Sequence, residues 1–457
     1  MGPLNRRHLG PTVRPCSGRR GIEERTCILR CAAVEVVLSY GKTGLPVELP
    51  DDNVTVVRPV FVPGLDDQRR AVADALEHPI GRPALRDVVR PSDTVAVVFC
   101  DATRPVPSKL ILPVLLGELE SAGVERDQVV LINALGTHRP SPPLELVELL
   151  GEDLVREYRI VQHDCNDRRA MALAGRLSTG QEFWVNRDYL NADFKILTGF
   201  IEPHFFAGFS GGGKLVFPGI ASIENIKEAH GYRILSHSGS TWGITHGNPV
   251  WELLTEGAQL TAPDFIVNVT LNSEKAITGV FAGELRAAHA RGAEHAKQTA
   301  MRAVPEPFDI VITTNSGYPL DRNVYQTIKG ISAAASIVRD GGAIIAAAEC
   351  IDGIPAGSHF HKLLQRAGTP ERALELIATP GFSTQDQWQV QLQAEIQMRS
   401  DVYLCSHRLS NDEIGTTMLK PCDRIEDTLA DLLQKYGPDA RICVLPEGPQ
   451  TIPYVEA

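Results

Sequence analysis

Two α/β domains are predicted from three features of this 457-residue sequence. Short apolar segments such as 94–100 (TVAVVFC) are typical of strands that are buried on both faces of a parallel sheet. They alternate with segments of helical period, as crossover connections require. The alternation stops at the Pro-bounded stretch 305–308 (PEPF) and restarts at 309–315 (DIVITTN). We therefore expect two Rossmann-like sheets, with a ligand cleft between the domains.

The predicted division of the chain has four parts. Residues 1–33 form an extension that we expect to be disordered, because residues 1–32 hold seven arginines, three prolines and no apolar period. Arginine richness also fits a transit segment, but Glu23 and Glu24 argue against one, and a start codon placed too early is a further interpretation. The first domain spans 34–304 and the second 305–438. Segment 439–457 closes the second sheet or returns to the first domain.

The first domain is predicted to begin with a hairpin in 34–50 and an amphipathic helical stretch, 65–90, that Pro79 and Pro83 interrupt. The strands that follow are expected at 94–100, 128–135, 159–164, 194–201, 265–271 and 275–281. The helices are expected at 108–122, 143–157 and 283–303.

The second domain repeats the same alternation. Its strands are expected at 309–315, 343–349, 401–406 and 440–446. Its helices are expected at 323–338, 359–367, 370–378 and 423–436, with helical character also in 383–399.

Composition restricts the class of protein. A net charge of −11 argues against a nucleic-acid footprint, and no apolar run is long enough to predict a membrane span. Hydrophobic content of 43% and charged content of 22% are ordinary for a globular protein. The nine cysteines are scattered without a paired metal-binding spacing, so we expect a reducing, cytoplasmic compartment.

Polar residues follow three of the predicted strands. Asp101 and Arg104 follow the first, His138 follows the second, and His204 and Lys214 lie in the loop after 194–201. Ligands of open α/β sheets bind beyond the carboxyl ends of strands. These three loops therefore predict one enzyme site.

The third loop contains Gly211, Gly212 and Gly213 directly before Lys214. Glycines allow close backbone approach to a ligand, and the lysine offers a phosphate contact or a nucleophile. The segment fits G-x-x-x-x-G-K, but Leu215 replaces the Ser/Thr that would bind magnesium, which argues against a nucleotide-hydrolysing P-loop. A flexible turn with a solvated lysine is the structural alternative.

A short helix is predicted after this loop. Ser222 is placed to cap it, Glu224 lies in its first turn and His230 near its end. In the second domain, Tyr325, Gln326 and Lys329 lie near the start of helix 323–338, and Gln326 and Lys329 share one face. That face either looks across the cleft or is solvated.

Five segments together resemble the nickel-dependent lactate racemase family, in order and approximate spacing. They are DATRP (101–105), GTHRP (136–140), EPHFFAGFSGGGKLVFPGIA (202–221), NIKEAH (225–230) and YQTIKG (325–330). The resemblance covers about residues 34–457. It implies two α/β domains with the active site in the cleft between them.

The resemblance also implies a racemase or epimerase of 2-hydroxy acids that carries a nickel-pincer nucleotide. It implies a thioamide tether of the cofactor at Lys214, beside the three glycines, and a nickel ligand at His230. It implies catalytic roles for His138 and His204. Substrate-binding or site-lining roles are implied for Asp101, Arg104, Tyr325, Gln326, Lys329 and Trp388.

The residue types agree with that chemistry. The C2 proton of a 2-hydroxy acid is too weakly acidic for an unaided histidine, whose pKa is about 6.5. A histidine can instead take the hydroxyl proton while a cofactor accepts hydride. Two enantiomers present mirror-related hydroxyls, so the expected bases are His138 and His204.

The implied partners are a small 2-hydroxy acid and cofactor-maturation enzymes. Two other functions stay open: a non-catalytic carrier of the nickel cofactor, and a phosphate-binding transferase that uses the Gly-Lys loop. The presence of both histidines argues against the first, and Leu215 argues against the second.

Overall fold

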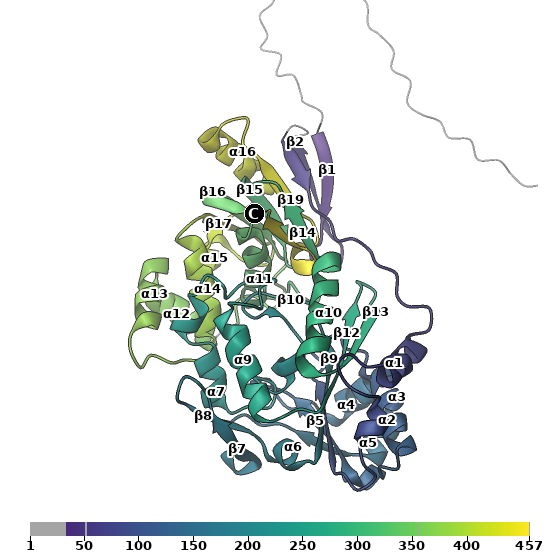
Figure 1. Ribbon diagram of the computed structural model, residues 1–457. Coiled ribbons are helices and arrows are strands. Elements are labelled where there is room, and N and C mark those ends of the chain that lie inside the picture. The colour runs from purple at the N-terminus through teal and green to yellow at the C-terminus, as the bar shows by residue number, and fades with distance from the viewer. Residues whose placement is uncertain (1–32, 51–52, 356, 457) are drawn as a thin grey trace, which may run out of the picture.

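The computed structural model describes residues 33–50, 53–355 and 357–456, and it contains two six-stranded sheets (Figure 1). This confirms the predicted α/β class. The predicted disorder of the N-terminal extension falls outside the described residues, apart from Ala33 at the start of the first strand.

The first sheet has the strand order β13-β12-β9-β4-β5-β6, and only the β12–β13 pair is antiparallel. Its strands are β4 (Val95–Cys100), β5 (Val129–Ala134), β6 (Arg159–Gln162), β9 (Phe194–Phe200), β12 (Phe265–Leu271) and β13 (Ile277–Gly283). The α-helices of this half are α1 (Gln68–Glu77), α2 (Leu85–Val88), α3 (Ser108–Ser121), α4 (Pro143–Leu150), α5 (Glu152–Glu157), α6 (Arg187–Asn191), α7 (Ile223–Ala229), α8 (Tyr232–Leu235), α9 (Pro249–Leu260) and α10 (Leu285–Ala300). Every residue of β4 is buried, as its apolar sequence requires at the centre of a covered sheet.

Several features of this half differ from the sequence prediction. The helix expected at 143–157 is two helices, because Gly151 between them has φ 92° and breaks the helical backbone. The helix expected at 283–303 ends at Ala300, because Met301–Val304 forms β14 and pairs with β20 (Ile452–Val455). The hairpin of β7 (Met171–Arg176) and β8 (Glu182–Asn186) was not predicted, nor was α9.

The second sheet has the order β18-β17-β16-β15-β19-β3, and all of its neighbouring strands are parallel. Its strands are β15 (Phe308–Thr314), β16 (Val338–Ala347), β17 (Asp401–Cys405), β18 (Lys420–Pro421), β19 (Ile442–Leu445) and β3 (Val54–Val56). The helices are α11 (Val324–Ala335), α12 (His359–Ala367), α13 (Pro370–Ala378), α14 (Gln387–Gln397), α15 (Asn411–Gly415) and α16 (Ile425–Tyr436).

Alternate residues of this sheet enter two separate cores, as the period of two of a strand requires. Val311 and Ile344 pack with apolar residues of α11 to α14 on one face. Ile310 and Ile345 pack with residues of α16 and of the N-terminal hairpin on the other face. The second sheet is therefore covered on both sides.

The N-terminal hairpin was predicted correctly as a hairpin, with β1 at Ala33–Leu38 and β2 at Leu45–Pro50. The prediction placed it in a first domain of residues 34–304. In the structure, Val36 and Leu38 pack on the second sheet, and β3 pairs with β19. Figure 1 shows the hairpin beside β19, away from the first sheet. The position of the hairpin depends on contacts between segments that are distant in sequence. The alternation of apolar residues along a strand does not predict such contacts.

The two halves are in contact. Ile201, Phe209 and Trp242 form one apolar cluster with Ala333 of α11 and Ile452 of β20. Trp388 of α14 is buried against the core of the first half. Of the C-terminal segment 439–457, β19 joins the second sheet and β20 pairs with β14, where the chain passes between the halves.

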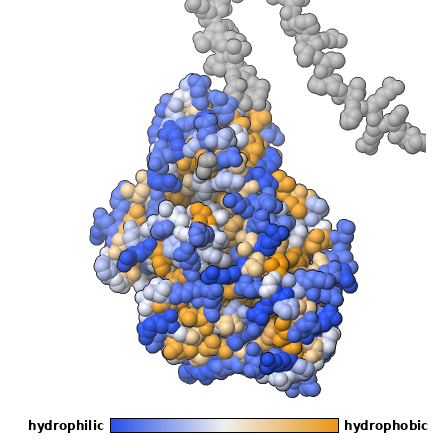
Figure 2. All heavy atoms as spheres, viewed as in Figure 1, coloured by the Kyte–Doolittle hydropathy of each residue, from blue (hydrophilic) through white to orange (hydrophobic). Residues whose placement is uncertain are grey.

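Within the described residues, no helix combines the length and the apolar character needed to cross a bilayer. On the face shown in Figure 2, hydrophobic residues lie in small groups between hydrophilic ones.

Candidate active site

Three of the loops that hold predicted site residues leave neighbouring strands. β4 lies between β5 and β9 in the first sheet, and all three run parallel. Their carboxyl ends therefore meet at one edge, followed by the segments that start at Asp101, Leu135 and Ile201. The structure brings these loops together as predicted.

Asp101 and His138 form a hydrogen-bonded pair in the first two loops. His138 Nδ1 lies 2.8 Å from Asp101 Oδ2, and the Thr103 hydroxyl donates to the same carboxylate at 3.0 Å. Burial of Asp101 opposes its ionisation, but the hydrogen bond and charge of His138, with Arg104, lower the pKa of the carboxyl. An ionised carboxylate only accepts, so Nδ1 of the exposed His138 ring carries a proton, and when the ring is neutral Nε2 presents a lone pair.

His204 lies in β10 (Pro203–His204), which pairs with β11 (Gly208–Phe209). Its Nδ1 accepts hydrogen bonds from the backbone N–H groups of Phe206 and Ala207, each at 3.2 Å. The Phe205 ring stacks on the imidazole at 4.7 Å between centroids, with 12° between the planes. Burial, and then the charge of Lys214, hold the pKa of His204 well below its ordinary value.

The glycine loop packs tightly against β12. Gly211 has φ 80°, and a Cβ there would lie 2.7 Å from Asn268 Oδ1. That oxygen accepts a hydrogen bond from Gly212 N at 2.7 Å. Glycine is therefore required for this contact. A short 3-10 helix over Gly212–Leu215 follows, so the loop does not lead into an α-helix as a P-loop does.

Lys214 ends this turn and is half-buried. Burial, and then the charge of Arg104, lower the pKa of its amine to about 7. A large part of the amine is therefore neutral near pH 7, which is the form that attacks an electrophile. This favours a reactive lysine over the solvated one that the sequence left as an alternative.

His230 forms the C-terminal cap of α7, whose N-terminal cap is Ser222 as predicted. Its Nδ1 lies 2.8 Å from Ile226 O, an atom that only accepts, so Nδ1 carries the proton. Burial, and then the charge of Lys214, lower the pKa of His230 to about 4, although the hydrogen bond to Ile226 opposes the shift. The ring is therefore neutral and offers Nε2 as a metal ligand, with its orientation fixed by the second nitrogen.

His230 offers a single ligand atom for a metal. Among residues 33–50, 53–355 and 357–456, no group of three or more His, Cys, Asp or Glu side chains is placed to hold a metal ion. A metal bound at His230 therefore needs its other ligands from a non-protein group. This donor set fits a metal held mainly by an organic cofactor.

Residues of the second half lie against the same site. The Trp388 and His230 ring centroids are 4.9 Å apart, and Trp388 Nε1 donates to the Tyr325 hydroxyl at 3.3 Å. Lys329 and Gln326 are half-buried on α11. Burial, and then the charge of Arg104 on the other half, lower the pKa of Lys329 to about 8, whereas Glu202 opposes the shift.

The sequence prediction missed Glu202 and Asp386. Desolvation by the surrounding protein raises the pKa of Glu202, although the charges of Arg104 and Lys329 oppose the shift. This carboxyl therefore lies among the cations of the site. Its place two residues before His204 was a signal that could have found it. Burial raises the pKa of Asp386, which has φ 64° and precedes α14 near Tyr325. No sequence pattern marked it.

A cavity of about 300 Å³ is lined by both halves of the chain. The lining residues are Thr137, Cys165, Asn166, Ile223, Lys227, His359, Ser383, Thr384 and Gln385. Thr137 precedes His138 in the chain, and Ser383 to Gln385 precede Asp386. The cavity is therefore lined by residues next to His138 and Asp386 in the chain.

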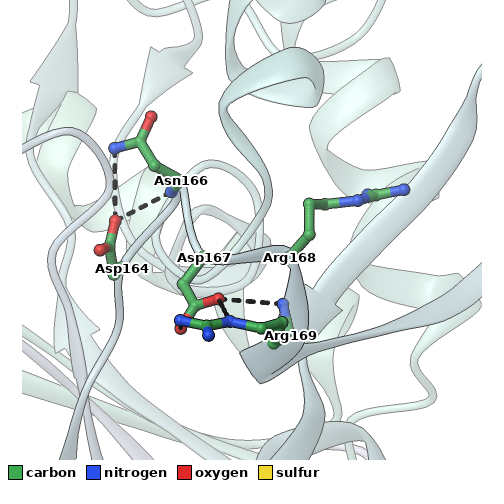
Figure 3. Close-up of a pocket in the computed structure, with 5 residues that line it drawn as sticks. All are labelled: Asp164, Asn166, Asp167, Arg168 and Arg169. Carbon is green, nitrogen blue, oxygen red and sulfur yellow. Dashed lines mark hydrogen bonds and ion pairs between the residues drawn. The ribbon is translucent and has the colours of Figure 1, made fainter.

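A second hollow of about 460 Å³ shares Asn166 with that cavity (Figure 3), and none of the predicted site residues lines either of them. Its carboxylates already have partners: Asp164 accepts from Asn166, and Asp167 pairs with Arg169.

Comparisons with known proteins point to one family. The model of the lactate racemase N-terminal domain matches residues 40–243, and that of the lactate racemase C-terminal domain matches 304–452. Lactate racemase of Thermoanaerobacterium thermosaccharolyticum is 33% identical over 422 residues, which cover 91% of this chain and 98% of the relative. Lactate racemase of Lactiplantibacillus plantarum is 34% identical over 420 residues, with the same coverage.

Solved structures give the same result. The lactate racemase apoprotein of T. thermosaccharolyticum superposes with a TM-score of 0.86 at 33% identity, over 93% of this chain and 100% of that one. A Thermotoga maritima protein superposes with a TM-score of 0.64 at 19% identity, over 86% and 100% of the two chains, and shares the fold. With both domain models and nearly the whole length of its relatives matched, the chain belongs to the lactate racemase family.

Proposed function

We propose that this protein interconverts the enantiomers of a short 2-hydroxy acid, lactate in the first instance, with a nickel-pincer nucleotide tethered to Lys214. Membership of the lactate racemase family makes the protein an isomerase. The observation that carries the finer proposal is the pair of Lys214 and His230. Lys214 offers a partly neutral amine. His230 offers Nε2, because its Nδ1 is held 2.8 Å from Ile226 O.

Each feature of the cofactor has a residue that suits it. Lys214 would form the covalent tether, the backbone of Gly211 to Gly213 would allow close approach, and His230 would ligate the metal through Nε2. When bound, such a cofactor supplies an electrophilic carbon that accepts hydride from C2 of the substrate. Gln326, Tyr325 and Trp388 would close the site from the second half.

The remaining groups handle the substrate. Arg104 offers a planar fork of donors to the carboxylate, and Lys329 adds a second positive charge. His138 and His204 act at the hydroxyl group. His138 Nε2 has a free lone pair because its other nitrogen donates to Asp101, so it can take the hydroxyl proton.

The test is to make the full chain together with cofactor-maturation enzymes, and then to measure bound nickel, the ultraviolet-visible spectrum and racemisation of D- and L-lactate. The proposal expects about one nickel per chain, an absorbing adduct and conversion in both directions. A loaded protein that converts neither lactate nor another 2-hydroxy acid would be a carrier. Protein that takes up no nickel under these conditions would refute the cofactor assignment.

A further inference from the structure

Two cysteines of the second half stand opposite each other on neighbouring strands. Cys405 is the last residue of β17, and Cys422 directly follows β18. The strands pair in parallel, with Leu404 opposite Pro421, and Cys422 N donates to Leu404 O at 3.0 Å. The next positions along the two strands are Cys405 and Cys422, so their side chains leave the sheet on the same face.

Both thiols enter the same core. Cys405 and Cys422 are 1% and 3% exposed and belong to the apolar cluster on the α16 side of the second sheet. Two further cysteines of this half, Cys350 and Cys443, belong to the cluster on the opposite face. Neighbouring strands lie about 4.7–4.9 Å apart, and disulfides span Cα separations of about 4.4–6.8 Å. A disulfide between Cys405 and Cys422 therefore needs no rearrangement of the strands.

The surroundings favour Cys422 as the thiolate of the pair. Thr428 of α16 donates its hydroxyl to the Cys422 sulfur at 3.2 Å. A hydrogen bond from the Cys405 thiol lowers the pKa of Cys422, and the same bond raises the pKa of Cys405. Burial and the charges of Asp423 and Glu426 oppose the lowering at Cys422. Cys422 also lies just before the N-terminal end of α16, whose partial positive charge favours a thiolate.

The pair lies at the edge of the second sheet. β18 is the outermost strand and consists of Lys420 and Pro421, which are both exposed. A short edge strand opens locally more readily than a central strand, because few hydrogen bonds hold it in place. A small oxidant can therefore reach the two buried sulfurs without global unfolding.

We propose that Cys405 and Cys422 form a site of reversible oxidation, at which a hydroperoxide converts the two thiols into an intramolecular disulfide. The Cys422 thiolate attacks one peroxide oxygen and the O–O bond breaks. Cys422 becomes a sulfenic acid, and the other oxygen leaves as an alcohol or as water with the proton that the Cys422 thiol released. The Cys405 sulfur then attacks the Cys422 sulfur, the S–O bond breaks, and the hydroxyl group leaves as water with the Cys405 proton. Two electrons pass from the thiols to the peroxide. The inference does not depend on the proposed racemase function.

Peptide mapping of the folded full chain tests this site and needs neither a cofactor nor activity. Trypsin releases Cys405 and Cys422 on separate peptides, 400–408 and 409–424, because the bond before Pro421 resists cleavage. The reduced protein is treated with hydrogen peroxide, remaining thiols are alkylated, and the digest is analysed by mass spectrometry with and without dithiothreitol. We expect the two peptides as one linked species, lighter than their sum by two hydrogen atoms, which dithiothreitol separates.

Two variants sharpen the mapping. C405S removes the second thiol, so the linked species should disappear and Cys422 should accumulate as a sulfenic acid that a dimedone probe labels. C443A is the matched control, because Cys443 is equally buried but lies in the core on the opposite face. Its removal should leave the yield of the linked species unchanged. The mapping of the wild-type chain remains decisive if either variant does not fold.

Two results would overturn the inference. One is recovery of the two peptides as separate species from the folded wild-type chain at every peroxide concentration tested. The other is an equal yield of links from Cys405 or Cys422 to Cys350 or Cys443, because that would show pairing without regard to the folded geometry.

Discussion

Replacing Asp101 by asparagine should lower kcat while leaving the fold and the tethered cofactor in place. The substitution keeps the size of a buried side chain but removes the charge that fixes the His138 tautomer. A hydrogen bond to a charged group is worth about 1.5–3 kcal/mol. At 1.36 kcal/mol for each factor of ten, D101N should lower kcat about 10- to 150-fold.

The assay is steady-state racemisation in both directions with nickel-loaded protein, and kcat and KM are determined separately. KM should change little, because Asp101 acts on His138 and not on the substrate. T103V is the matched control: it removes a neutral hydrogen bond to the same carboxylate, worth about 0.5–1.5 kcal/mol, and should cost only about 2- to 12-fold. A D101N protein with wild-type kcat, or one whose kcat falls no further than that of T103V, would refute the role of the carboxylate.

The same variant makes a prediction about pH and stability. The folded pKa of Asp101 lies below its ordinary value of 3.8. The ionised carboxyl therefore stabilises the folded protein above pH 3.8, and this contribution disappears as the pH falls through the folded pKa. Denaturant unfolding of wild type and D101N should differ most at neutral pH and converge in acid. A difference that grows in acid would contradict this reasoning.

Three further predictions concern the cofactor, the substrate and α7. Lys214→Ala should abolish the covalent adduct seen by intact mass spectrometry of loaded protein, and an unchanged adduct mass would remove the tether assignment. Arg104→Lys should keep nickel but lose much of kcat/KM, because an ammonium cannot donate two parallel hydrogen bonds to a carboxylate, and a near-normal kcat/KM would contradict that role. Ser222→Ala removes a cap that accepts from Asn225 N at 3.3 Å, so denaturant unfolding should show a loss of about 0.5–2 kcal/mol. Equal stability of S222A and wild type would show that the cap contributes nothing.

Sequence patterns located most of the regular structure because local signals mark it. Helices α12 and α13 have the predicted bounds, 359–367 and 370–378. Their ends carry chemical signals: Ser358 and Thr369 accept hydrogen bonds from the first turns, and Gly368 adopts the left-handed conformation between the helices. The hairpin β7–β8 was missed because its register shifts between Leu173 and Gly175, which weakens the alternation of a strand.

The sequence predicted which loops form the candidate site, but not the individual contacts within it. Asp101 and His138 follow neighbouring parallel strands, and this alone predicts that they approach each other. The hydrogen bonds at His204 were not predictable, because they depend on where a turn directs two backbone N–H groups. The lining of the 300 Å³ cavity was not predictable either, since it combines residues such as Cys165 and His359 from loops distant in sequence.

The pairing of β3 with β19 has a consequence for how the protein folds during its synthesis. Val54 pairs with Ile442, so the edge strand of the second sheet leaves the ribosome long before its partner. At roughly 5–20 residues per second, that interval lasts roughly 20 to 80 s. The strands of the first sheet all lie between residues 95 and 283, so that sheet can form before the second one has been synthesised. During this interval the apolar faces of the hairpin and of β3 have no partner in the second sheet.

A fragment that begins at the linker would lack those strands altogether. Residues 304–457 alone would leave β19 as an open edge and expose the face that Val36 and Leu38 cover. We therefore expect the second half to aggregate when it is made by itself. The start of the chain, although it is synthesised first, completes the second sheet only after β19 has been made.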